Sequence, residues 1–90
     1  MHNNEYYTKF YMENKTETGF IVITVEHRSA HMEYNRIKFN ERKYETMVFP
    51  CKNDGSPDID RCVKTKYTYS EDKAYLCHLQ TWESFRGNND

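Results

Sequence analysis

The residues of this chain that could bind a metal are its three cysteines and four histidines. Cys51, Cys62, Cys77 and His78 supply four candidate zinc ligands, but no CxxC or HxxxH pair brackets them at a zinc-finger spacing. On a helix Cys77 and His78 would point about 100° apart, which keeps both from reaching one ion. We therefore expect no metal and no cofactor. The thiols are expected to stay reduced, and a Cys51–Cys62 disulfide is an alternative only if the protein is exported.

Two further groups of polar residues resemble metal ligands but have simpler explanations. His27 and His31 are four residues apart, which would align them on a helix, yet the strand-like pattern before His27 argues against a helix there. Asp54, Asp58 and Asp60 crowd one loop, but its glycine comes too early for an EF-hand, and no glutamate closes the loop at the required spacing. We interpret the first group as solvent-facing histidines and the second as a polar turn.

Catalytic motifs are missing from the sequence. It contains no nucleophile elbow, Walker loop, dinucleotide fingerprint or HExxH motif, and its three glycines are too few for a backbone that cradles phosphate. A candidate catalytic pair such as His31 and Glu33 can be found by chance in any chain of this size, so it does not indicate an enzyme. We expect a protein that is not an enzyme.

A row of aromatic and basic residues is the strongest candidate for a binding site. Tyr7, Lys9 and Tyr11 alternate along one face of a predicted strand, and Arg36 with Lys38 form a second patch. In such a row the tyrosines could stack on the bases of single-stranded nucleic acid and the basic residues could neutralise its phosphates. Tyrosine and arginine also anchor protein interfaces. The net charge of −1, from 13 basic and 14 acidic residues, favours protein recognition over binding to a polyanion.

The composition predicts more sheet than helix. The chain has eight tyrosines, five phenylalanines and eight threonines, but only two leucines and two alanines. Aromatic and β-branched side chains suit the half-buried surface of a sheet. Fourteen aromatic residues exceed what one core of 90 residues readily hides, so some of them should be exposed.

Hydrophobic periodicity predicts five strands followed by one helix. Ser70 is a suitable N-cap and begins a helix that ends near Gly87. In residues 27–35, Ser29 could cap a short helix, or the segment could lead directly into the next strand; we interpret it as a loop. Residues 53–58 give the strongest turn signal. The predicted strands cover residues 5–12, 20–27, 33–39, 43–49 and 61–69.

The side chains expected in the core come from the second strand and from the helix. Ile21, Ile23 and Val25 should face the core, with Phe20, Val22 and Thr24 on the opposite face. The helix should bury the apolar residues that recur every three or four positions. This expected stripe consists of Tyr75, Leu76, Leu79, Trp82 and Phe85.

These elements predict an α+β domain, in which one C-terminal amphipathic helix packs on one face of a mainly antiparallel sheet of about five strands. Residues 1–87 are expected to form this single domain and residues 88–90 a disordered tail. Residues Met1–Glu5 show no basic region followed by an apolar run, and no membrane-spanning stretch follows, so we expect a cytoplasmic protein without membrane contact.

The sequence thus favours a non-enzymatic domain that binds another protein stoichiometrically. A composition typical of A/T-rich coding sequences suggests a phage or mobile-element inhibitor of a host enzyme or complex. Self-association through an edge strand would give a homo-oligomer. The alternative is a single-stranded nucleic-acid-binding module that uses Tyr7, Lys9 and Tyr11.

Overall fold

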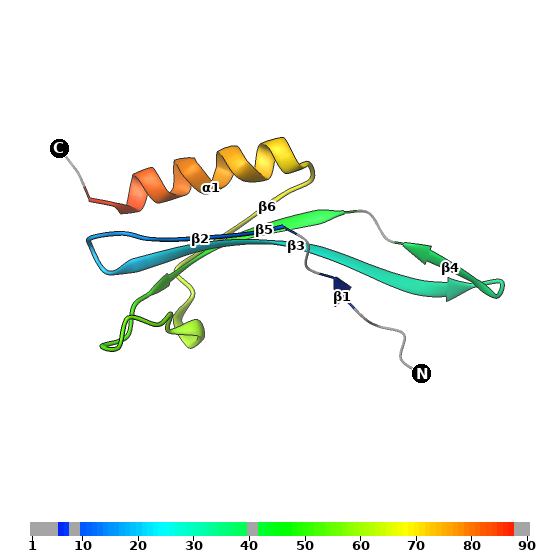
Figure 1. Ribbon diagram of the computed structural model, residues 1–90, viewed down its shortest axis with the longest axis horizontal. Coiled ribbons are helices and arrows are strands. Elements are labelled where there is room, and N and C mark those ends of the chain that lie inside the picture. Colours follow the sequence, from blue (N-terminus) through cyan, green and yellow to red (C-terminus); the bar gives the residue numbers. More distant parts are fainter. Residues whose placement is uncertain (1–5, 8–9, 40–41, 88–90) are drawn as a thin grey trace.

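The computed structural model describes residues 6–7, 10–39 and 42–87 of the 90-residue chain, and it confirms the predicted α+β class. Its main sheet is antiparallel in the order β2-β3-β5-β6, and the helix α1 covers one face of it (Figure 1). The predicted tail, residues 88–90, lies outside the described residues. The elements are β1 (Tyr6–Tyr7), β2 (Tyr11–Lys15), β3 (Phe20–Glu33), β4 (Arg36–Phe39), β5 (Lys43–Pro50), the 3₁₀-helix η1 (Ile59–Arg61), β6 (Lys64–Thr68) and α1 (Glu71–Phe85).

Strand β3 is the central strand of the molecule, since β1, β2, β4 and β5 all pair with it. It runs without interruption for 14 residues, so the loop predicted over residues 27–35 is wrong. The single strand predicted over residues 5–12 is also wrong, because β1 and β2 are separate strands. Tyr7 lies opposite Arg28 and Tyr11 lies opposite Val25. The two tyrosines are four residues apart and their partners on β3 only three, so the register of pairing shifts by one residue between β1 and β2.

The far end of β3 and strand β4 form a two-stranded arm that extends beyond the main sheet (Figure 1). Tyr34 and Asn35 close it with positive φ angles of 52° and 60°, as a two-residue type I′ hairpin turn requires. The arm makes the molecule elongated, with extents of 55 × 27 × 17 Å. Its radius of gyration is 15.6 Å, whereas a compact chain of this length would have about 12 Å.

Helix α1 begins as predicted, because the Ser70 hydroxyl accepts a hydrogen bond from the backbone nitrogen of Lys73 at 3.2 Å. The apolar stripe predicted for its buried face is wrong for Tyr75 and Leu76, which are more than half exposed. Its C-terminal part does pack on the sheet: Trp82 and Phe85 are half-buried, Nε1 of Trp82 donates to the backbone oxygen of Lys15 at 2.9 Å, and the Phe85 ring contacts that of Phe20. The side chains buried against the sheet are small or polar: Ala74, Cys77, His78 and Thr81.

The facing predicted for β3 is likewise wrong on the side that meets the helix. Val22 and Thr24 lie under α1, opposite Val48 and Thr46 of β5, and all four are buried. Ile21 and Phe49 are buried on the other face, at the end of the sheet where residues 51–63 lie (Figure 1). Both faces of β3 therefore contribute to the core at this end, because a layer covers each of them.

The close packing of α1 on the sheet predicts that position 74 cannot accept a larger side chain. Ala74 is fully buried, so Ala74→Leu should overpack the interface and lower the free energy of unfolding by about 1 to 3 kcal/mol. Gln80→Leu, at an exposed position of the same helix, should change it by less than about 0.5 kcal/mol. Urea unfolding of both variants at low protein concentration measures the difference, and equal losses would contradict this orientation of the helix.

Candidate protein-binding surface

The face of the sheet opposite α1 is a candidate surface for a partner. Directly paired residues of an antiparallel sheet share a face, so the pairs Tyr11–Val25 and Ile23–Met47 lie together there. Tyr67 joins them from β6 through its pairing with Glu45. Tyr11 is 57% exposed and Tyr67 46% exposed, whereas Ile23, Val25 and Met47 are half-buried. We call these five residues the open face.

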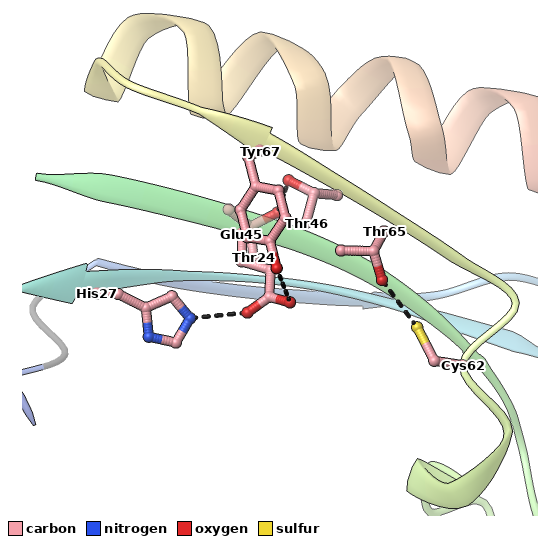
Figure 2. A network of polar contacts seen from close by, with 7 residues as sticks. All are labelled: Thr24, His27, Glu45, Thr46, Cys62, Thr65 and Tyr67. Carbon is pink, nitrogen blue, oxygen red and sulfur yellow. Dashed lines mark hydrogen bonds and ion pairs between the residues drawn. The ribbon is translucent and has the colours of Figure 1, made fainter.

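Glu45 organises the β5–β6 side of the open face (Figure 2). One carboxylate oxygen lies 2.8 Å from Nε2 of His27, and the other accepts a hydrogen bond from the hydroxyl of Tyr67 at 3.2 Å. Nζ of Lys43 lies 4.7 Å from the centre of the Tyr67 ring, in the geometry of a cation–π contact. The negative charge of Glu45 is the main cause that raises the pKa of Tyr67.

A second tyrosine–glutamate pair lies at the β2 edge of the same face. The hydroxyl of Tyr11 donates to Oε1 of Glu13 at 2.6 Å, and this hydrogen bond is the main reason why the pKa of Tyr11 is raised. Each exposed tyrosine of the open face is therefore held against a carboxylate. This arrangement fixes the phenol oxygens and places negative charge beside both aromatic rings.

The five residues predicted to bind a partner are placed as follows. Tyr11 belongs to the open face, whereas Lys9 lies outside the described residues and only the backbone pairing of Tyr7 is described. Arg36 and Lys38 are exposed on β4, where they pair with Glu33 and His31. Strand alternation puts them on the same face of the sheet as Tyr11, but about 20 Å (Lys38) and about 26 Å (Arg36) farther along β3. Their role in binding stays a prediction.

Sequence reasoning missed His27, Glu45 and Tyr67 as neighbours. They come from three strands, and only the register between β3, β5 and β6 brings them together. Alternation within β6 does place Tyr67 on one face, but it gives no information about which glutamate lies opposite.

On the helix side, a buried chain of hydrogen bonds joins the sheet to α1. The hydroxyls of Thr46 and Thr24 lie 2.7 Å apart, and Oγ1 of Thr24 lies 2.7 Å from Nδ1 of His78. Nε2 of His78 lies 2.8 Å from Oδ1 of Asn14, which can only accept, so Nε2 carries the proton and Nδ1 accepts from Thr24. Burial lowers the pKa of His78, which keeps the ring neutral.

The residues weighed as metal ligands are dispersed. Both ring nitrogens of His78 are used in the hydrogen bonds above, and Cys77 is buried beside Thr81. Cys62 is exposed, with its sulfur 3.2 Å from Oγ1 of Thr65 (Figure 2). Within residues 6–7, 10–39 and 42–87, no group of three or more histidine, cysteine, aspartate or glutamate side chains is placed to hold a metal ion.

Comparison with known proteins gives no match: no protein-family model, no curated protein and no solved structure is similar to this chain. In the part of the chain that the structure describes, no helix is long and apolar enough to cross a membrane.

The buried chain of hydrogen bonds predicts an order of stability among two isosteric variants. Thr24→Val removes the donor to Nδ1 of His78 and leaves this buried nitrogen unpaired, so it should cost about 1 to 3 kcal/mol. Thr46→Val removes one terminal hydroxyl and should cost about 1 kcal/mol. Urea unfolding measures both, and a larger loss for Thr46→Val would contradict the direction assigned to the chain.

The lowered pKa of His78 predicts a pH-dependent stability. The unfolded chain takes up a proton at this residue near its ordinary pKa of about 6.5, while the folded chain does not until a lower pH. The free energy of unfolding should therefore be highest above pH 6.5 and fall as the pH drops from there towards the folded-state pKa. The His78→Gln variant should lose this part of the slope, and a slope equal to that of the unmodified protein would assign it to other groups.

Proposed function

We propose that this chain is a non-enzymatic protein-binding domain that engages its partner stoichiometrically through the open face. The observation that carries the proposal is the pairing of each exposed tyrosine with a glutamate, Tyr11 with Glu13 and Tyr67 with Glu45, around a half-buried apolar centre. Tyrosine supplies a large contact area with few rotatable bonds, so little conformational entropy is lost when rings that are already held become buried.

The same pairs disfavour the alternative of single-stranded nucleic acid. A base that stacks on Tyr11 or Tyr67 would bring its phosphate close to a carboxylate, and the repulsion would oppose binding. Charge on this face is balanced, since Lys15 and Lys43 are offset by Glu13 and Glu45. A protein surface with an apolar centre and both signs of charge at its rim fits this pattern better than a polyanion does.

The mode of action that we propose is occlusion. The open face is an extended surface over four neighbouring strands, β2, β3, β5 and β6, so we expect it to cover a partner and not to convert it. Together with the A/T-rich character of the composition, this supports a phage or mobile-element inhibitor of a host protein as the specific form of the proposal.

The two tyrosines provide the test. A tagged double variant, Tyr11→Ala with Tyr67→Ala, should lose at least about 90% of the partner that the unmodified protein captures from host lysate in near-stoichiometric yield, since central aromatic residues carry most of the binding energy. Tyr34→Ala, the same change at the exposed arm tip, is the matched control and should retain the partner. Circular dichroism checks that both variants are folded.

Nuclease treatment and salt separate the two classes of partner. Retention after nuclease, with weak dependence on salt, supports a protein partner. Recovery of nucleic acid, with bound proteins lost after nuclease and with steep salt dependence, would refute the proposal. Equal capture by the double variant and the unmodified protein would show that the open face is not the binding surface.

A further inference from the structure

The arm has one apolar side and one charged side. Met32 of β3 pairs with Ile37 of β4, and the two side chains are 58% and 65% exposed. The neighbouring pairs, His31 with Lys38 and Glu33 with Arg36, point to the other side. A two-stranded ribbon with an uncovered apolar side is marginally stable in water, so this side is suited to being covered.

The apolar side of the arm belongs to the same sheet face that α1 covers farther back. Met32 is eight residues from Thr24 on the uninterrupted strand β3, and an even spacing keeps both on one face. Thr24 contacts His78 of α1. In Figure 1 the helix lies over the main sheet and stops before the arm, so no described element covers Met32 and Ile37.

Helix α1 has an uncovered apolar side of its own. Tyr75, Leu76 and Leu79 are 53%, 54% and 37% exposed and lie within about one turn of each other, on the side away from the buried Ala74 and His78. A surface helix normally buries such residues, so this side of α1 lacks a covering layer in the monomer.

The two uncovered surfaces are complementary in position and charge. They occupy different stretches of the long axis on one side of the molecule (Figure 1), so a two-fold axis between them places the helix of each copy over the arm of the other. Helix α1 carries three carboxylates against one ammonium, and Arg86 just beyond it pairs with Glu83, which leaves one net negative charge. The arm carries Arg36 and Lys38 against Glu33, on the side away from Met32 and Ile37. The opposite net charges therefore act at longer range, where they favour the approach of helix to arm over that of arm to arm.

We infer that the partner of these surfaces is a second copy of this chain, bound in a symmetric dimer with two equivalent arm-to-helix contacts. Each contact joins Met32 and Ile37 of one copy to Tyr75, Leu76 and Leu79 of the other. The dimer leaves the open face free, so it does not depend on the function proposed above.

Sedimentation equilibrium of the unmodified protein and of two variants tests the dimer. The arm variant is Met32→Thr with Ile37→Thr, and the helix variant is Leu76→Gln with Leu79→Gln, which keep strand and helix propensity. Each should weaken the dimer by about tenfold or more, because two apolar side chains lose their burial. Tyr67→Ala, on the other face, should dimerise like the unmodified protein.

Mixing the two variants distinguishes arm-to-helix contacts from other dimers. In a mixed dimer one of the two contacts is formed by an unmodified arm and an unmodified helix, so an equimolar mixture should dimerise more strongly than either variant alone. A helix variant that dimerises normally, or a mixture no stronger than its components, would overturn the inference in favour of arm-on-arm or edge-strand association.

Hydrogen exchange of the unmodified protein gives a readout that needs no variant. Raising the protein concentration should slow amide exchange in β4 and in the exposed side of α1 together. A protein that remains monomeric up to about 1 mM, where association would be weaker than about 4 kcal/mol, would overturn the inference. Capture of a lysate partner by that monomer would still support the proposed function, so the two failures can be told apart.

Discussion

The hydrogen bond between His78 of α1 and Thr24 of β3 decides which side of the sheet the helix covers. A neutral imidazole buried without partners would be costly, and the structure satisfies both ring nitrogens by seating the helix over Thr24 and Asn14. Small side chains beside it, such as Ala74, allow the close approach that these bonds need. The helix thereby presents its small and polar side to the sheet and turns Tyr75 and Leu76 towards solvent.

The position of α1 over Thr24 and Asn14 determines which surfaces of the molecule stay uncovered. With α1 on the Thr24 side, the alternate residues of β2, β3, β5 and β6 form the open face, and the tyrosine–glutamate pairs lie there. Because β3 continues for seven residues past Glu26, the arm extends the sheet beyond the end of the helix. Two apolar surfaces remain on the helix side, one on the arm and one on α1, and neither can reach the other within one copy.

The sequence allowed the fold class, the Ser70 cap and the turn near residue 55 to be predicted, because each depends on local chemistry. It did not allow the facing of α1 to be predicted. Hydrophobic periodicity favours burial of Tyr75 and Leu76, and the competing preference of His78 is visible only once Thr24, 54 residues away, lies opposite it. The arm was missed for a local reason: its turn, Tyr34–Asn35, lacks the glycine that usually marks a type I′ hairpin.

The candidate site follows the same division between local and long-range information. Tyr11 and Glu13 are two residues apart on one strand, so alternation alone places them on one side. Glu45 and Tyr67 meet only because β5 and β6 pair across an irregular connection whose length does not fix their register. The Tyr11–Glu13 pair needs only strand β2 to form, whereas the Tyr67–Glu45 pair is lost if β6 pairs with β5 in another register. A shift of β6 by one residue would turn Tyr67 to the helix side and leave Glu45 with His27 alone, so this half of the open face depends on the β5–β6 register.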